Sequence, residues 1–539
     1  MCIHPVEKAS RRSLRGQKGQ RKVSAQSLLY FRNNEETQWK NDGKIKENQL
    51  QIPARDANVA VVLQETFFSE GNAKEADQSD MKTGETFFTQ DRAFYRQLFS
   101  IFIMVALQNL VAYSVNMIDN VMMGSYSQTS LSGAATVNQI FFLVQQVSIA
   151  VCDAHIILAS QYYGQGRMTP VRKITGLALK LGLGCGLFFA VICALFPAPV
   201  LGFFTRDGAI VAEGMRYMQI LLFTFPLFIL TSVMMGALRC VGTVKISFYV
   251  SVVSLIVNTA INYTLIFGHF GFPEMGIRGA AIGTLTARAL EFLIVLFYVR
   301  VRDKKLELFS ESFLTGAGQL AGDFIRVAVP VIVMAMIWAI SVPLQTAILG
   351  HLPGADASDA IAANSVSMTF YQYLKVVVSA MASASAVVMG QSVGKGNMRR
   401  IRSDARTLSV VDLGIGLVLA LLLFILRGPL LAHYSLTPTA LQYANQIIIV
   451  LCFVMVGMSY QMPVCNGVLR GSGDTTFTMW MNIISIWGIV MPLSLLAAFV
   501  WKLPIPLVVL CIQSDQIFKG LPVFLRVRSG KWIKRLTRD

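Results

Sequence analysis

The chain has 539 residues, of which 54% are hydrophobic and only 14% are charged, and its mean hydropathy is +0.55. Because the surface of a soluble domain needs about a quarter of its residues charged, this composition excludes a soluble globular protein. The formal net charge of +17 could suggest a nucleic-acid partner, but the basic residues lie in the N-terminal segment, in loops between apolar runs and near residue 539. This placement follows the positive-inside rule of membrane proteins, so we expect no nucleic-acid partner.

Residues 1–90 differ from the rest of the chain. They are rich in charge and show neither a periodic apolar face nor the long apolar core of a signal peptide. We therefore predict a disordered cytoplasmic N-terminal extension. Met81 lies just before the second of two similar short motifs, and we hypothesise that natural translation begins there.

Twelve apolar runs follow, most of them near the roughly 20 residues that a spanning helix needs. They are residues 97–122, 134–159, 174–196, 215–237, 246–268, 279–300, 324–349, 361–390, 406–426, 441–466, 477–501 and 504–526. The last run is the weakest, because Asp515, Gln516 and Lys519 interrupt it. Since no run alternates as a barrel strand does, we predict an all-α polytopic membrane protein with twelve transmembrane helices.

The first run carries one acid, Asp119. A carboxylate at membrane depth costs at least about 2.5 kcal/mol, so it persists where it faces a cavity, a partner or an ion. At 100° per residue, Asn109, Tyr113, Asn116 and Asn120 form one narrow stripe, and Gln108 lies with Asp119 beside it. The alternative is an acid at the headgroup level, because Gly124 follows closely. Because the polar stripe extends into the middle of the helix, it favours an Asp119 that faces a hydrated interior of the protein.

Two motifs recur at nearly the same offset. Residues 236–242 (GALRCVG) return as residues 467–473 (GVLRGSG), and residues 161–166 (QYYGQG) return as residues 391–396 (QSVGKG). An even number of spans separates the copies, so the repeats share one orientation and form two pseudo-symmetric six-helix bundles. We expect the N-terminal bundle at residues 91–305, a cytoplasmic linker at 306–322, and the C-terminal bundle with its basic tail at 323–539.

Lys and Arg gather in the loops after even-numbered spans, as at Arg300, Lys305, Arg399 and Arg400. The positive-inside rule therefore predicts a multi-pass protein of the cell membrane with both termini in the cytoplasm.

Together these residues resemble the multidrug and toxic compound extrusion (MATE) family of secondary transporters. The resemblance covers about residues 90–535. It rests on residues 118–124 ending the first span, the Gln161–Gly166 loop, the paired Gly-x-Leu-Arg motifs, and residues 279–284 opening span six. Membership implies export of organic, often cationic, compounds in exchange for inward Na⁺ or H⁺, with no cofactor beyond that ion.

The resemblance also implies a cation-coupling site in the N-terminal bundle. In the branch with an acid in the first span, the matching positions are Asp119, Asn258, Asn262 and Thr284. Asn262 departs from the best-known pattern, which has an acid there, and leaves one carboxylate. Ser251 and Ser254 share the face of Asn258 and Asn262, and for these two serines we favour helix packing.

Other polar and aromatic residues allow two interpretations. A substrate cleft is predicted at these residues, although ordinary helix packing explains them almost as well: Gln108, Tyr113, Asn116, Met334, Trp338 and Tyr371. Arg288 and Glu291 are expected to neutralise each other. A pair between Lys375 and Asp412 inside the second bundle is a further hypothesis.

Three other functions fit this sequence less well. A flippase for lipid-linked oligosaccharides or other amphiphiles shares a similar layout but usually has a more cationic cavity, for which the deep basic residues here are few: Lys180, Arg288, Arg326 and Lys375. An enzyme lacks support, because no catalytic motif lies in the spans. A membrane receptor or scaffold is the most distant alternative. The expected partners are small organic substrates and membrane lipids; the compound, the ion and the oligomeric state stay open.

Overall fold

In the computed structural model, the described residues are 88–303, 305–308, 318–350, 357–432, 434 and 436–538. They belong to one compact unit, Thr86–Asp539. Most of the predicted N-terminal extension and the hypothetical start at Met81 lie outside the described residues. Within those residues the secondary structure is helical, without strands, as the sequence predicts.

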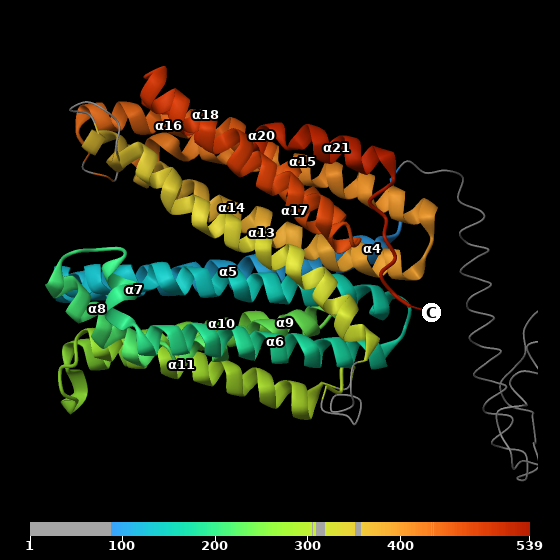
Figure 1. The fold of residues 1–539 in the computed structure, drawn as a ribbon, viewed down its shortest axis with the longest axis horizontal. Helices are drawn as coiled ribbons and strands as arrows, with labels where there is room; N and C mark the ends of the chain where they lie inside the picture. Colours follow the sequence, from blue (N-terminus) through green and yellow to red (C-terminus); the bar gives the residue numbers. More distant parts are fainter. Residues whose placement is uncertain are drawn as a thin grey trace, which may run out of the picture. The chain divides into compact units, whose positions relative to one another are not determined.

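The first group of helices forms the N-terminal bundle (Figure 1). Its elements are α4 (Arg92–Tyr126), α5 (Gln128–Gly164), α6 (Met168–Leu195), α7 (Pro197–Gly202), α8 (Gly208–Leu221), α9 (Thr224–Cys240), α10 (Lys245–Phe267), η1 (His269–Gly271), α11 (Ile277–Phe297) and η2 (Tyr298–Arg302). Leu306 and Leu308, in the predicted linker, are fully buried in the same core as this bundle.

The second group forms the C-terminal bundle (Figure 1). Its elements are α13 (Gln319–Gly350), α14 (Ala357–Lys395), α15 (Met398–Leu431), α16 (Pro438–Met462), η3 (Pro463–Leu469), α17 (Thr475–Ile483), η4 (Ile484–Val490), α18 (Met491–Leu495), η5 (Leu496–Val500), α19 (Ile505–Ile512), α20 (Asp515–Phe518) and α21 (Gly520–Ser529). The helix α13 also contacts α5 and α6, and so joins the two bundles.

Ten helical segments in the described residues are long and apolar enough to cross a membrane, and two bent pairs bring the number to twelve. One pair is α8 with α9, which meet at 49°. Pro226 lies in the first turn of α9, where its missing N–H costs no helical hydrogen bond. The predicted fourth span is therefore a broken helix.

The other bent pair holds the polar residues that weaken the last apolar run. Between α19 and the α20–α21 segment the axis turns by 44°. Here Lys519 Nζ lies 2.8 Å from Asp515 Oδ2, and both side chains are buried. Lys519 also donates to Asn482 Oδ1 on α17, at 2.8 Å. The charges are thus neutralised within the bundle.

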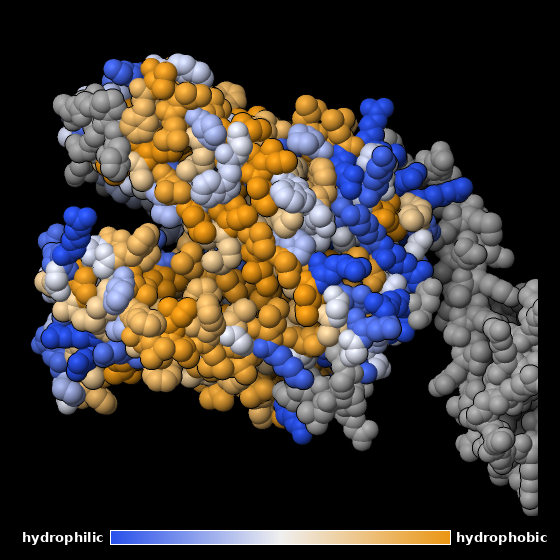
Figure 2. All heavy atoms as spheres, viewed as in Figure 1, coloured by the Kyte–Doolittle hydropathy of each residue, from blue (hydrophilic) through white to orange (hydrophobic). Residues whose placement is uncertain are grey.

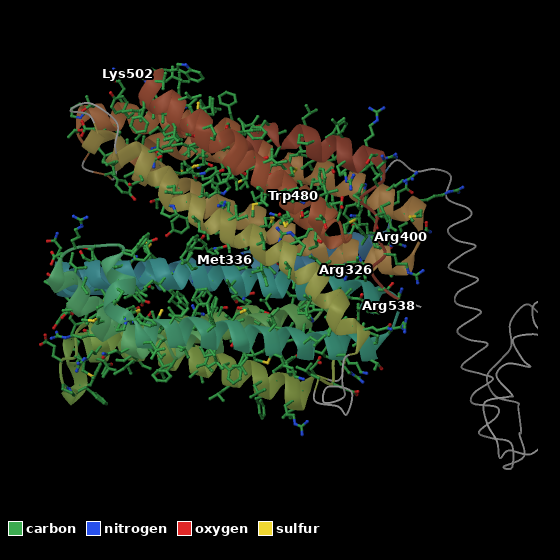
Figure 3. All side chains as sticks on the ribbon, in the orientation of Figure 1. Arg326, Met336, Arg400, Trp480, Lys502 and Arg538 are labelled. Atoms are coloured by element: carbon green, nitrogen blue, oxygen red, sulfur yellow. The ribbon has the colours of Figure 1, made fainter. Side chains whose placement is uncertain are left out.

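Apolar side chains cover the middle of the molecular face in Figure 2, with polar ones toward its two ends. Arg400 and Arg538 lie at the end that holds the C-terminus, and Lys502 lies at the opposite end (Figure 3). A belt of this kind matches the hydrocarbon core of a bilayer with helices crossing it.

The bundles meet at the end that holds the C-terminus, which we call the closed end. There Gln97 Nε2 on α4 donates to Gln391 Oε1 on α14 (2.8 Å), and Gln391 Nε2 donates to the carbonyl of Cys240 (2.9 Å). Arg400 pairs with Asp91. Partial burial opposes ionisation of Asp91, but hydrogen bonds from the Ala93 N–H and from Arg400 offset it and lower its pKa. At the other end a cleft separates the bundles (Figure 2).

Residues 531–538 form a tail that crosses the closed end. Trp532 is fully buried, and Lys534 pairs with Asp474 of the C-terminal bundle at 2.6 Å. The backbone N–H of Leu536 then donates to Gln161 Oε1 on α5 at 2.9 Å. Beyond it, Arg538 pairs with Asp323 on α13. The tail therefore holds on to both bundles.

Candidate functional site

Small residues bring α11 unusually close to α10. A Cβ atom at Gly279 would lie 2.7 Å from the backbone of Leu265, and one at Gly283 would lie 2.0 Å from Asn262 Oδ1. The contact at Gly279 is with backbone and requires hydrogen there, whereas a side chain at Gly283 would displace the Asn262 amide. These two glycines therefore set the distance between the Asn258–Asn262 face of α10 and Thr284 of α11.

The four residues predicted for cation coupling lie together and form one hydrogen-bond network. Asn262 Nδ2 donates to Asp119 Oδ1 at 2.7 Å and to Asn258 Oδ1 at 3.3 Å. Asn258 Nδ2 lies 3.5 Å from Thr284 Oγ1. Both asparagines are buried. The single carboxylate is thus held from α10 by an amide that donates to it.

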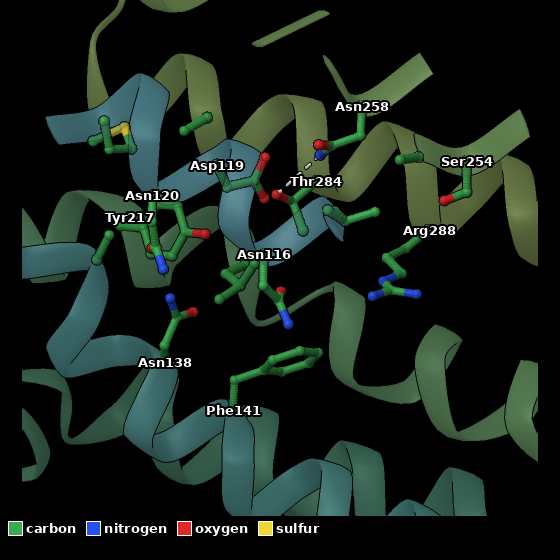
Figure 4. Close-up of a pocket in the computed structure, with 16 residues that line it drawn as sticks. Asn116, Asp119, Asn120, Asn138, Phe141, Tyr217, Ser254, Asn258, Thr284 and Arg288 are labelled. Carbon is green, nitrogen blue, oxygen red and sulfur yellow. Dashed lines mark hydrogen bonds between the residues drawn. The ribbon is translucent and has the colours of Figure 1, made fainter. Parts of the chain in front are cut away.

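A small cavity opens beside this network, inside the N-terminal bundle (Figure 4). Its volume is about 40 Å³. A water molecule needs only about 10–15 Å³ of such space, whereas pockets for drug-sized ligands span about 300–1,000 Å³. The cavity therefore suits an ion with a few waters and is too small for an organic compound.

Several polar residues that line the cavity were not predicted for cation coupling. They are Asn116, Asn120, Asn138, Tyr217, Ser254 and Arg288. Ser254, for which the sequence favours a packing role, lies one turn before Asn258, and that spacing places it on the same helix face. Asn138 and Tyr217 come from α5 and α8, and no periodicity within one helix relates them to Asp119.

Arg288 brings a positive charge to the cavity wall. Its guanidinium pairs with Glu291 at 2.8 Å, as the sequence predicts, and stacks over Phe228 at 4.9 Å from the ring centre. The pair is neutral, so Asp119 supplies the uncompensated negative charge at the cavity. Carboxylate, amide and hydroxyl oxygens are ligands suited to a hard monovalent cation, and a carboxylate also takes a proton.

The polar stripe of α4 continues from the cavity along the surface between the bundles. Asn109 Nδ2 lies 3.5 Å from Ser379 Oγ on α14, and the rings of Tyr113 and Tyr373 lie 6.3 Å apart. The hydroxyl of Tyr373 also donates to Met117 Sδ at 3.2 Å. Helix α4 therefore contributes to the ion-sized cavity and also contacts α14 of the other bundle.

The residues predicted for a substrate cleft lie in several places. Asn116 lines the cavity, Tyr113 faces α14, and Gln108 donates to Met235 Sδ at 3.3 Å. Met334 and Trp338 lie on α13, where Lys375 Nζ stands 5.1 Å from the Trp338 ring centre.

Tyr371 differs from the other predicted cleft residues. It is buried in the core of the C-terminal bundle, and its hydroxyl donates to Met458 Sδ at 3.0 Å. The structure thus does not gather all six residues into one pocket.

The predicted pair between Lys375 and Asp412 is wrong. Asp412 is buried on α15, and neither of its carboxylate oxygens has a hydrogen-bond partner among the described residues. Lys375 turns to Trp338 instead. Sequence spacing could place both charges in one bundle but could not give their directions.

Asp153 on α5 pairs with an arginine of the other bundle. Arg470 Nη1 donates to Asp153 Oδ2 at 2.7 Å. His155 does not join this pair: it is buried, and its Nε2 hydrogen-bonds Thr175 Oγ1 at 2.9 Å. The contact between Asp153 and Arg470 joins residues 317 positions apart, and no local pattern indicates it.

The MatE family model matches this chain twice, at residues 105–264 and at residues 330–496. The two matches fall on the two bundles and together cover more than half of the chain.

The chain belongs to the MatE family.

It is therefore a membrane transporter and not an enzyme. Among its relatives, the probable multidrug resistance protein NorM of Thermotoga maritima is 25% identical over 436 residues, which cover 80% of this chain and 92% of the relative. The multidrug resistance protein PmpM of Pseudomonas aeruginosa is 25% identical over 408 residues, covering 75% and 84%.

Solved transporter structures share the fold. A crystal structure of the Vibrio cholerae MATE transporter VcmN superposes with a TM-score of 0.74 at 18% identity and covers 82% of this chain and 98% of that one. A transporter of the MOP superfamily from Pyrococcus furiosus superposes with a TM-score of 0.74 at 15% identity, covering 84% and 100%. At these identities the likeness supports the two-bundle architecture.

Proposed function

We propose that this transporter is an antiporter that exports organic, mainly cationic, compounds in exchange for inward Na⁺ or H⁺. The curated relatives are named as multidrug resistance proteins, and the family relationship supports the same role here. Asp119 is the coupling acid, and Asn258, Asn262 and Thr284 complete its site.

One observation carries this proposal. The carboxylate of Asp119 and three neutral oxygen-bearing side chains from α10 and α11 meet beside a cavity of about 40 Å³ within one bundle. A cation bound there neutralises the Asp119 carboxylate and changes the hydrogen bonds between α4 and α10. Because α4 also contacts α14 across the bundles, the ion biases the two states of the transporter differently.

The closed end is assigned to the cytoplasm of the cell. Basic residues such as Arg400 and Arg538 lie there, in agreement with the positive-inside rule (Figure 3). The cleft then opens to the outside, and the structure represents the state that releases the exported compound. Both ends of the described chain lie on the cytoplasmic side in this arrangement.

The cleft offers suitable surfaces for an organic cation. Tyr113 and Tyr373 lie side by side where α4 meets α14, with Met117 beside them, and would join the cleft if these helices part. Aromatic faces attract cations, and methionine adapts to irregular apolar groups.

The flippase alternative receives less support. Its pyrophosphate ligand would need several unpaired positive charges, yet of the deep basic residues Arg288 is paired with Glu291 and Lys375 lies against the Trp338 ring.

The test is transport into inverted membrane vesicles, driven separately by a Na⁺ gradient and by a proton gradient. Wild-type protein should accumulate a fluorescent organic cation with one of the two gradients. Asp119→Asn should abolish the driven uptake at a matched level of folded protein. Asp359→Asn, which removes a carboxylate that Thr437 and Thr439 hold elsewhere, is the control and should transport normally. Undiminished uptake by Asp119→Asn would move the coupling site to another acid.

A further inference from the structure

The two arginines of the repeated Gly-x-Leu-Arg motifs cross between the bundles in opposite directions. Arg470, in the C-terminal bundle, donates to Asp153 on α5 at 2.7 Å. Arg239, in the N-terminal bundle, donates to Ser383 on α14 at 2.9 Å. We call these four residues the interbundle clasp.

The clasp follows the internal repeat of the sequence. Asp153 lies eight residues before Gln161, and Ser383 lies eight residues before Gln391, the equivalent glutamine of the second repeat. Each arginine therefore reaches the same position of the other repeat. One of these two positions is an acid and the other is a hydroxyl. The repeat is symmetric in its contacts but not in its charge.

The two members of the ion pair are held unequally. Arg470 keeps two further partners within its own bundle, Asn466 Oδ1 at 2.6 Å and Met334 Sδ at 3.5 Å. For Asp153, Arg470 is the only hydrogen-bond partner among the described residues. Its side chain is 32% exposed, against 5% for Arg470. When the bundles part at this end, Arg470 keeps Asn466 and Met334, whereas Asp153 loses its hydrogen-bond partner and keeps only the charge of Arg239 in its own bundle.

An acid within a membrane protein persists where it is paired or faces water and an ion. Because Asp153 lies where the two bundles meet, we expect that parting them at this end exposes it to the compartment on that side. The guanidinium of Arg470 already shows which group fits the acid: a planar organic cation with N–H donors.

On the basis of the function proposed above, we propose that Asp153 is the entry site for organic cations carrying amidinium, guanidinium or ammonium groups. Such a cation binds Asp153 while the closed end is open. Arg470 then displaces it as the bundles meet, so that closure drives the cation toward the cleft. Arg470 acts as a competitor built into the protein.

The experiment compares two variants that both lack the clasp ion pair. Arg470→Gln removes the competitor and leaves Asp153 without its ion-pair partner, whereas the double variant Asp153→Asn/Arg470→Gln also removes the acid; Arg239, whose charge also acts on Asp153, is the same in both. Binding of the fluorescent bis-amidine DAPI to the purified full chain is measured by fluorescence titration. Arg470→Gln should bind DAPI at least about tenfold more tightly than wild type, because a competing closed state lowers apparent affinity. The double variant should lose this gain.

Asp359→Asn in the Arg470→Gln background is the matched control, because it removes one carboxylate away from the clasp; it should keep the tight binding. Equal DAPI affinities of Arg470→Gln and the double variant would overturn the proposal that Asp153 is the entry site. Both variants lack the clasp ion pair, and they differ only in the acid. Failure of the proposed function has a different signature, namely no gradient-driven export by wild-type vesicles. Charge repair by Asp153→Arg/Arg470→Asp serves as a folding check for the clasp itself.

Discussion

Gly164 lies directly against Gln391 at the closed end, so that a Cβ atom on the glycine would come within 2.3 Å of the Gln391 carbonyl oxygen. The second repeat makes the same contact in return, because a Cβ atom at Gly394 would lie 2.1 Å from the carbonyl oxygen of Gln161. Both clashes involve backbone, which cannot turn away as a flexible side chain can. The approach of the bundles at this end therefore requires glycine at both positions.

Gly164→Ala and Gly394→Ala should each keep the closed end from closing fully. The added methyl group meets a backbone oxygen, so the bundles must move apart to accept it. We expect loss of gradient-driven export together with a longer distance between spin labels on α5 and α14, measured by electron paramagnetic resonance. Gly184→Ala on α6 is the control, because nothing lies within 4 Å of its added atom. An unchanged distance in both variants would contradict the requirement for glycine.

Asn262→Asp should strengthen binding of the coupling cation. The new carboxylate would replace an amide that now donates to Asp119 Oδ1 at 2.7 Å. Two carboxylates this close repel each other unless a cation lies between them, so the cation gains affinity. Calorimetric titration of the purified protein with NaCl measures the effect. Asn262→Leu removes the amide without adding charge and should not show it; a similar gain in both variants would exclude the electrostatic explanation.

Trp532→Ala should destabilise the protein by about 3–5 kcal/mol, the usual cost of removing a buried tryptophan side chain. The indole is fully buried and its Nε1 donates to the carbonyl of Val527 at 2.9 Å. Asp323→Asn, which breaks the exposed pair with Arg538, should leave the unfolding temperature nearly unchanged. Thermal unfolding in detergent compares the two variants. Equal losses would mean that the tail is held by its charges rather than by Trp532.

Labelling of single cysteines tests the assignment of the two ends. Phe203→Cys, next to α7, and Met398→Cys, at the start of α15, use side chains that are 86% and 56% exposed. In intact cells, a membrane-impermeant maleimide should label the first position directly and the second only after permeabilisation. The reverse labelling pattern would show that the closed end faces the outside of the cell and the cleft faces the cytoplasm.

The sequence predicts the elements of this fold well, because bilayer thickness and helical periodicity act along the chain. It also predicts the meeting of Asp119 with Asn258 and Asn262, although here the family resemblance supplied the relation between helices. It does not predict that Asp153 meets Arg470, or that Lys375 turns away from Asp412. These outcomes depend on how the helices pack and rotate about their axes, and one sequence gives no measure of either.

The residues that line the cavity also differ in how well the sequence predicts them. Ser254 shares a helix face with Asn258, so its place follows from spacing alone. Tyr217 reaches the cavity from α8, whose direction depends on the 49° break before α9. The sequence shows Pro226 near that break but not the angle. The sequence therefore predicts site residues that share one straight helix, but not those whose position depends on a bend between helices.

The tail that joins both bundles also imposes an order on biosynthesis. Residues 531–538 leave the ribosome after every spanning helix has been made. The hydrogen bond from Leu536 to Gln161 therefore forms only after 375 further residues have been synthesised. Until then, the nascent N-terminal bundle lacks part of its surface at the closed end. A ribosome that stalls late would release a chain with all its spanning helices inserted and this end unsealed, a form that membrane quality control could recognise.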